Sequence, residues 1–477
     1  MPLKSPRLSR LLTALLGAQL LLAGSPASVS AATTAPLQPV ASAGFTPPAA
    51  TDCRRPMRTH EVPGQVATAE PAISKGSLPR SRAPGSSGRD SVAKTAPSAT
   101  TPAVAMLRET AMPEMAIAVP APSSSPALQP VAATPVTAGM VDDNADFAEY
   151  LAFRARTNVP HQARDISERY LLEVKDAAGR GVSDAQVQVR SPDGATLWAR
   201  TDTAGHVWLH PKAFDKASST LYQVTVSRGG QTAQGLLRRG QKDAVEVQLG
   251  GTRAPQRARL DLVFLIDATG SMADEIHKLK SSLRSIAADA ARLPSRPDLC
   301  FGLVAYRDRT DPFVLRSHDF TNDLNAFQKV LDQLQADGGG DYPEAMSEAL
   351  HQTVHRLAWR GDGATRMVVL LADAPPQLGA DRPAYDTAML AALGKGIKVF
   401  SVGASGLDPQ GEFIQRQIAQ FTGGRFVFLT YDRAGDPGSG PGRETVHDVK
   451  NYSVATLDRL IGRLIREELA PLSRRGS

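Results

Sequence analysis

Three carboxylates and two hydroxyls in the C-terminal half of the chain stand where they could bind a divalent cation. Asp267, Thr269 and Ser271 occupy alternate positions at the end of an apolar run. Asp341 follows three consecutive glycines, and Asp373 ends a second apolar run. Carboxylate and hydroxyl oxygens are hard ligands, which suit Mg²⁺, Mn²⁺ or Ca²⁺ better than zinc or copper. These residue types predict a site for Mg²⁺, with Mn²⁺ or Ca²⁺ as alternatives.

The elements that must position these residues are strands buried on both faces. Short, almost wholly apolar runs are typical of parallel strands covered by helices, and ligands bind at the carboxyl ends of such strands. From residue 259 onward, apolar runs alternate with helical patterns, which predicts an α/β fold with a doubly wound, mostly parallel sheet. We expect strands at 260–266, 299–306, 313–317, 367–371, 398–402 and 426–429, and helices at 272–292, 323–335, 343–357, 383–393, 410–421 and 454–469.

The spacing of Asp267, Thr269 and Ser271 matches the motif Asp-x-Ser/Thr-x-Ser, and it resembles the metal-ion-dependent adhesion site (MIDAS) of von Willebrand factor type A (VWFA) domains. The resemblance extends over residues 259–470 and implies a Rossmann-like fold. It also implies that Thr269 and Ser271 give neutral oxygens, while Asp267 and Asp373 act through water or by fixing the hydroxyls. In adhesion members, a Glu or Asp of a partner protein completes the metal shell.

Asp341 departs from that pattern, because many family members have Thr in the second loop. An extra carboxylate should tighten cation binding but partly neutralise the ion. Two interpretations stay open: a metal that captures a partner's carboxylate, and a metal that only stabilises the domain.

Other polar residues near these loops have simpler explanations. Asp274 and Glu275 could bind a second ion, as in some relatives, but negative charge at a helix N-terminus is the favoured interpretation. Arg307 and Asp308 are expected to form a supporting charge pair. The pair at His351 and His355 lacks the Glu of a metalloprotease helix, so a polar helix face is expected.

An enzymatic alternative is phosphoryl transfer at Asp267. The run 267–271 looks like the phosphorylated motif of P-type ATPases, but Ala268 replaces its Lys and the associated motifs are missing. Neither a nucleophile elbow nor a phosphate-binding glycine loop is found. We therefore expect a protein without enzymatic activity.

Residues 143–251 predict a short helix near 146–156, followed by an antiparallel β-sandwich. Short alternating runs separated by Gly- and Asp-containing turns favour such a sandwich. The segments 174–187 and 201–205 resemble carboxypeptidase-regulatory-like and collagen-adhesin B-type domains. The resemblance implies a spacer or supporting domain.

The N-terminal third indicates export. Residues 1–31 combine basic residues, a short apolar core and a small-residue cleavage site, as a signal peptide does. They hold three positive charges and no acid, which is half of the net charge of +6, so the remainder gives little support for a nucleic-acid partner. Residues 32–142 are rich in Pro, Ala, Ser and Thr, which favours a disordered linker, and residues 471–477 form a tail. No run is long enough for a membrane span.

Cys53 and Cys300 are the chain's two cysteines. Cys53 falls in the expected linker and Cys300 in an expected core strand, so an unpaired state is favoured. Together these patterns predict an exported protein, periplasmic or extracellular, that mediates metal-dependent protein–protein interaction or adhesion. The alternative is an extracytoplasmic structural or assembly factor.

Overall fold

The computed structural model describes residues 45–53, 57–65, 135–251, 257–340, 342–361 and 363–473. Predictions for the signal peptide (1–31), for Asp341 and for most of the linker concern residues outside these ranges.

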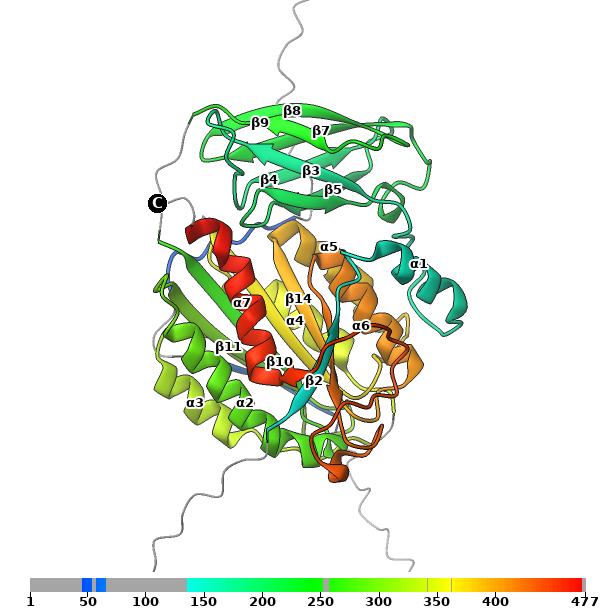
Figure 1. Cartoon of the computed structure of the whole chain (residues 1–477), viewed down its shortest axis with the longest axis vertical. Helices are drawn as coiled ribbons and strands as arrows, with labels where there is room; N and C mark the ends of the chain where they lie inside the picture. Colours follow the sequence, from blue (N-terminus) through cyan, green and yellow to red (C-terminus); the bar gives the residue numbers. More distant parts are fainter. Residues whose placement is uncertain are drawn as a thin grey trace, which may run out of the picture. The chain divides into compact units, whose positions relative to one another are not determined.

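A large mixed sheet lies at the centre of the described structure, and its middle strands are parallel (Figure 1). Its strand order is β1-β12-β11-β10-β13-β14-β15-β2-β16, and β11, β10, β13, β14 and β15 are mutually parallel. The strands are β1 (Thr59–Pro63), β2 (Thr137–Val141), β10 (Arg259–Asp267), β11 (Asp298–Tyr306), β12 (Phe313–Thr321), β13 (Ala364–Ala372), β14 (Ile397–Gly403), β15 (Phe426–Thr430) and β16 (Ala455–Thr456).

Helices cover both faces of this sheet, because its middle strands are apolar on both sides. One buried cluster joins side chains of α2, α3 and α7 to Leu262 and Phe264 of β10, and another joins α4, α5 and α6 to Val263 and Leu265. The helices are α2 (Ala273–Ala291), α3 (Leu324–Gln333), α4 (Met346–Arg356), α5 (Tyr385–Lys395), α6 (Pro409–Thr422) and α7 (Leu457–Ser473). The strands and helices begin and end within a few residues of their predicted positions.

Helix α1 (Phe147–Arg156) and two smaller sheets come between β2 and β10. One sheet has the order β6-β3-β9 and the other β5-β4-β7-β8. Their strands are β3 (Tyr170–Lys175), β4 (Gln186–Arg190), β5 (Thr196–Arg200), β6 (His206–Leu209), β7 (Leu221–Arg228), β8 (Gln231–Arg238) and β9 (Val245–Gln248). Buried side chains alternate along most of them, and those of both sheets share one apolar cluster. The relation of this region to a known sandwich family stays a prediction.

Two strands correct the prediction of a disordered segment over residues 32–142. Strand β1 pairs antiparallel with β12, and β2 pairs antiparallel with β15. Neither segment has a clear strand pattern in its sequence. Each forms backbone hydrogen bonds with a strand that lies far away in the sequence and would otherwise be at the edge of the sheet. Pairing with an existing edge supplies the hydrogen bonds that the segment cannot make alone.

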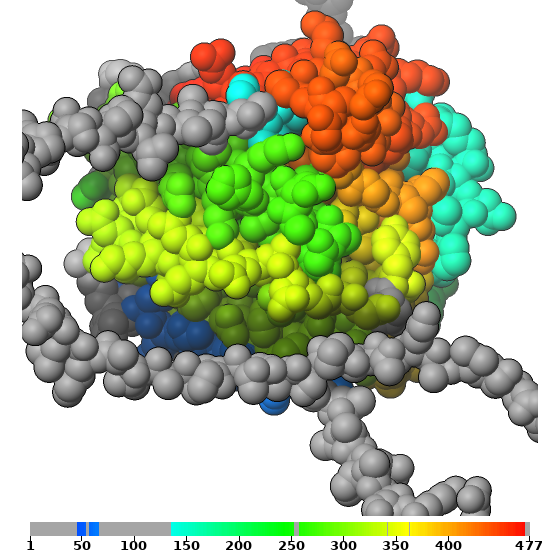
Figure 2. All heavy atoms as spheres, turned by 90° about the horizontal axis from the view of Figure 1, so that it is seen from below, coloured from blue at the N-terminus to red at the C-terminus, as the bar shows by residue number. Residues whose placement is uncertain are grey.

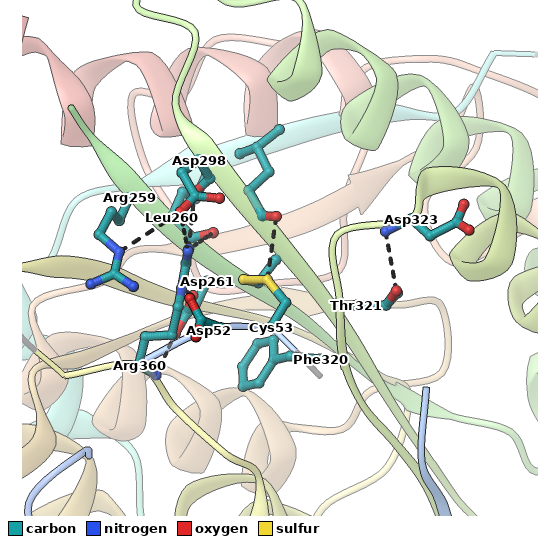
Figure 3. The surroundings of a disulfide bond; sticks show 12 residues. Asp52, Cys53, Arg259, Leu260, Asp261, Asp298, Phe320, Thr321, Asp323 and Arg360 are labelled. Carbon is teal, nitrogen blue, oxygen red and sulfur yellow. Dashed lines mark hydrogen bonds and ion pairs between the residues drawn. A yellow bond between two sulfur atoms is a disulfide. The ribbon is translucent and has the colours of Figure 1, made fainter. Parts of the chain in front are cut away.

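A disulfide joins Cys53 to Cys300, with the Cα atoms 5.9 Å apart, so the favoured prediction of unpaired cysteines was wrong. Cys53 lies beside the start of β10 and β11, near the ion pair of Asp261 with Arg360 (Figure 3). The pairing could not be inferred from spacing, because the two positions have a sequence separation of 247.

The smaller sheets contact the large sheet at the amino ends of its parallel strands. Asp184, in the turn before β4, accepts hydrogen bonds from Arg366 of β13 and from the backbone N–H of Gly363. Thr203 donates to the carbonyl of Glu468 in α7. The carboxyl ends of the strands therefore stay clear of the smaller sheets. In the described part of the chain, no helix has the length and apolarity needed to cross a membrane.

Candidate metal site at the carboxyl ends of the strands

Asp267 and Asp373 lie at the carboxyl ends of the neighbouring strands β10 and β13. Asp267 is the last residue of β10, and Asp373 follows the last residue of β13. Thr269 and Ser271 lie in the short turn that leads from β10 into α2. The parallel register thus brings four of the five predicted ligands to one edge of the sheet, and Asp341 lies outside the described residues.

A series of oxygens leads from the buried Asp267 to the surface. Asp267 Oδ1 accepts hydrogen bonds from the backbone N–H of Thr269 at 3.0 Å and from its hydroxyl at 2.7 Å. The Thr269 and Ser271 hydroxyl oxygens are 3.0 Å apart. Asp267 and Thr269 are buried, whereas Ser271 is exposed. Ser271 is therefore the member of the series that solvent or a ligand reaches first.

The surroundings of the Asp267 and Asp373 carboxylates suit a bound cation. Burial, followed by the charge of Asp373, raises the pKa of Asp267 to about 7. Burial and then the charge of Glu275 raise the pKa of Asp373 to about 6, while the Ser271 hydroxyl acts in the opposite direction. Asp267 Oδ2 and Asp373 Oδ1 are buried and have no hydrogen-bond partner among the described residues. Unpaired buried carboxylate oxygens of like charge form an environment that a hard divalent cation would stabilise.

A glycine loop closes against this turn. Gly338 accepts a hydrogen bond from the Gly270 N–H at 2.9 Å, and the Gly339 N–H donates to Asp311 Oδ2 at 2.9 Å. Gly338 and Gly339 both have positive φ, and a Cβ on Gly338 would lie 1.9 Å from Asp311 Oδ1. Only glycine fits there. Figure 2 views this edge and shows the green segment at the start of α2 beside the yellow-green segment before α4.

Glu344 also belongs to this site, although the sequence did not single it out. Its side chain is buried, and Oε2 has no partner among the described residues. Burial, and then the charges of Asp267, Asp308 and Asp373, raise the pKa of Glu344 to about 9. Its one signal in the sequence was its place three residues after Asp341. Helix α4 begins only at Met346, so Glu344 lies in the loop rather than in the predicted first turn.

Glu275 and Arg307, near the candidate site, make contacts that differ from those predicted. Glu275 is in the first turn of α2 but is buried, and its Oε1 accepts from the Ser405 N–H at 3.0 Å and from the hydroxyls of Ser405 and Tyr431. Arg307 pairs with Asp337 at 3.5 Å. Glu275 thus ties the start of α2 to the loops after β14 and β15.

Asp308 supports the loop before α4 through Gln377. Its Oδ1 accepts from Gln377 Nε2 at 2.7 Å, and the same amide nitrogen donates to the Pro343 carbonyl at 2.8 Å. The ring centroids of His351 and His355 are 4.4 Å apart. Both residues lie on α4, away from this edge of the sheet.

Among the described residues, no three His, Cys, Asp or Glu side chains are arranged as a metal-ligand group. Cation binding would therefore depend on the hydroxyls of Thr269 and Ser271 as well as on carboxylates.

The chain resembles known proteins over its C-terminal half. Residues 261–400 match the model of the von Willebrand factor A domain. The alpha-protein kinase vwkA of Dictyostelium discoideum is 30% identical over 121 residues, which are 24% of this chain and 18% of that protein. Human hemicentin-1 is 34% identical over 84 residues, 17% of this chain and 1% of that protein. The chain thus spans under a fifth of the length of the relatives that it matches.

Among solved structures, the pilus adhesin SpaC of Lactobacillus rhamnosus GG in an open conformation matches 67% of this chain and 40% of that chain, at 11% identity and a TM-score of 0.31. This likeness is too low to support an argument about function. The residues 261–400 that are similar to the von Willebrand factor A domain include most of β10, the glycine loop and β13.

Proposed function

We propose that this protein binds a protein partner through a divalent cation held at the carboxyl ends of β10 and β13. The observation that carries the proposal is the pair of unpaired buried oxygens, Asp267 Oδ2 and Asp373 Oδ1, beside the Thr269–Ser271 hydroxyl pair. Such a set offers a hard cation two charged and two neutral oxygens. A cation at the exposed end of that set would be accessible from solvent.

Each residue has a distinct role in this proposal. Ser271 and Thr269 bind through their hydroxyls, while Asp267 fixes the Thr269 hydroxyl through Oδ1 and balances the positive charge. Bound Mg²⁺ would supply an electrophilic position for an Asp or Glu of the partner. Glu344 and Asp341 would add negative charge, which strengthens cation binding and weakens attraction for the partner's carboxylate. A purely stabilising cation is the second candidate, and the buried Glu344 carboxylate favours it.

Calorimetry with Mg²⁺ tests the cation site. We expect Ser271→Ala to weaken binding about tenfold or more, because one neutral ligand is lost. Ser281→Ala is the matched control: its hydroxyl donates to the Lys278 carbonyl within α2, away from the site. Equal Mg²⁺ affinity in both variants and the wild type would contradict the proposal.

Glu344→Gln separates the two candidate roles of the cation. The substitution keeps the size of the side chain but removes the negative charge that the carboxyl would carry beside a bound cation. We expect lower affinity for Mg²⁺ and tighter capture of a carboxylate partner at saturating Mg²⁺. Partner capture from the native extract is compared in Mg²⁺ and in EDTA; capture that persists undiminished in EDTA favours the stabilising role.

We also propose that the protein acts outside the cytoplasm and by binding rather than by catalysis. The Cys53–Cys300 disulfide supports an oxidising compartment, where such bonds persist. Removal of the signal peptide would leave a mature N-terminus near Ala32, which N-terminal sequencing of the native protein checks. Stable phosphorylation of Asp267 by ATP, detected as an acyl phosphate, would instead favour phosphoryl transfer.

The smaller sheets fit the role of a supporting domain. They contact the amino ends of the parallel strands, opposite the proposed cation site. Similarity to carboxypeptidase-regulatory-like domains is part of this proposal.

A further inference from the structure

Residues 45–53 and 57–65, here called the N-terminal strap, lie along the β11–β12 side of the large sheet, from the amino ends toward the carboxyl ends of its parallel strands. The strap begins at the amino ends of the strands. There Phe45 stacks on Trp198 of β5, with ring centroids 4.9 Å apart. Ala50 accepts from the Gly361 N–H at 2.9 Å and donates to the Trp359 carbonyl at 3.2 Å. Three residues later, Cys53 forms the disulfide with Cys300 of β11.

The second half of the strap runs beside β12 toward the carboxyl ends of the strands. Strand β1 pairs with β12 from Thr59 opposite His318 to Pro63 opposite Phe313. Glu61 forms an ion pair with Arg316 at 2.7 Å. Most residues of β1 are exposed, so pairing to β12, rather than burial, holds this segment.

The end of the strap is fixed to the loop between β11 and β12. The Gly64 N–H donates to the Pro312 carbonyl at 3.2 Å, and the Gln65 N–H donates to the Arg309 carbonyl at 2.6 Å. A Cβ on Gly64 would lie 1.8 Å from the Asp311 carbonyl oxygen. This close backbone contact leaves no space for a side chain.

The same loop holds the glycine loop of the candidate metal site. Asp311 Oδ2 accepts from the Gly339 N–H at 2.9 Å, and Gly338 in turn accepts from the Gly270 N–H. Gly270 lies between Thr269 and Ser271. Direct contacts therefore lead from the strap, through Asp311 and Gly339, to the turn that carries the site hydroxyls.

We propose that the N-terminal strap positions the glycine loop for cation binding, and that reduction of the Cys53–Cys300 disulfide releases it. The cation part of this inference rests on the proposed function. Without the disulfide, β1 is a five-residue, exposed edge strand, a type of element with low local stability. Its detachment would free the loop at Arg309–Pro312 and, through Asp311, loosen the contact with Gly339.

The reductant would be a protein dithiol. Cys300 is fully buried while Cys53 is partly exposed, so a thiolate of the dithiol reaches the Cys53 sulfur. A mixed disulfide with Cys53 forms, the Cys53–Cys300 bond breaks, and Cys300 leaves as a thiolate that takes up a proton. The second thiol of the dithiol then attacks the reductant's own sulfur in the mixed disulfide, which closes the reductant's disulfide and releases Cys53 as a thiolate that takes up a proton. In total, two electrons and two protons pass to the cystine.

Two variants test the strap from its two ends. Cys53→Ser removes the disulfide, whereas Gly64→Ala keeps it but forces the end of the strap away from Asp311. Gly462→Ala in α7 is the matched control, because the nearest atom to its added Cβ is 3.6 Å away. Hydrogen exchange by mass spectrometry reports on residues 313–318 and 335–340, and calorimetry reports Mg²⁺ affinity.

In both test variants we expect faster exchange at 313–318 and 335–340, with β13 and β14 still protected. We expect Mg²⁺ affinity to fall about threefold to tenfold, and the control to match the wild type. The two variants could instead exchange faster at 313–318 but at the wild-type rate at 335–340. That result would overturn the coupling between the strap and the glycine loop. If wild type binds no Mg²⁺, the proposed function fails. Hydrogen exchange at 335–340 still shows whether the strap positions the glycine loop.

Discussion

At the scale of single residues, the site combines groups that are unfavourable without a cation. Burial and the charge of Asp373 raise the pKa of Asp267, burial and the charge of Glu275 raise the pKa of Asp373, and Glu344 adds a third carboxyl whose pKa is also raised. A folded carboxyl with a raised pKa retains a proton that the unfolded chain has released. Stability from this site therefore falls as pH rises from about 4, through the pKa values of Asp373 and Asp267, toward that of Glu344 at about 9.

We predict that Asp267→Asn stabilises the metal-free protein, because the amide cannot become charged. Asn can still accept the Thr269 hydrogen bonds through Oδ1, and its amide can replace the carboxylate beside the Tyr306 hydroxyl. In EDTA, the variant should gain about 1–3 kcal/mol over wild type at about pH 8 and little at about pH 5. Urea unfolding at both pH values measures this gain.

Addition of Mg²⁺ should reverse this order. Wild type should gain roughly 2.7 kcal/mol when Mg²⁺ is at about 100 times its Kd, and Asp267→Asn should gain little. A variant that responds to Mg²⁺ as strongly as wild type would remove Asp267 from the site.

At the scale of elements, a buried ionic cluster connects the smaller sheets to the large one. Asp184 contacts the guanidinium groups of Arg200 at 2.9 Å, Arg228 at 3.1 Å and Arg366 at 2.9 Å. Burial alone would raise the pKa of Asp184, but these groups, Arg366 foremost, hold it well below its usual range. The stabilisation is present at neutral pH and is lost only as pH falls through that lowered value.

Asp184→Asn should destabilise the protein by about 3–5 kcal/mol at neutral pH, because it leaves buried arginines without their counter-charge. Asp289→Asn is the control: its pairing with Arg292 is exposed on α2 and should contribute less than about 1 kcal/mol. Urea unfolding compares the two. A loss as small as that of the control would show that this cluster does not hold the elements together.

At the scale of the whole molecule, the disulfide closes a loop of 247 residues between the strap and β11. Removing it frees the unfolded chain more than the folded chain, so Cys53→Ser should cost about 2–5 kcal/mol. Chemical denaturation of oxidised wild type, reduced wild type and Cys53→Ser checks this. The reduced wild type should behave like the variant; full stability in both would mean that the strap contacts suffice without the bond.

The sequence alone was sufficient for the main elements of the α/β region and for the placement of Asp267, Thr269, Ser271 and Asp373 at one edge of its sheet. Apolar runs such as that of β10 indicate burial on both faces, and this depends on local composition alone. The turn from Asp267 to Ser271 is also local, so its motif could be recognised directly. The match to the von Willebrand factor A model over residues 261–400 agrees with the resemblance predicted there.

Only the tertiary structure showed which strands pair with the edges of the sheet and which residues from distant parts of the sequence lie at the candidate site. Strands β1 and β2 have little pattern of their own, and their order comes from hydrogen bonds to β12 and β15. Glu344 becomes significant only because chain folding places it near Asp267 and Asp373. Local sequence determines which segments must be buried, whereas pairing across hundreds of residues depends on which edges and charges the folded chain leaves unpaired.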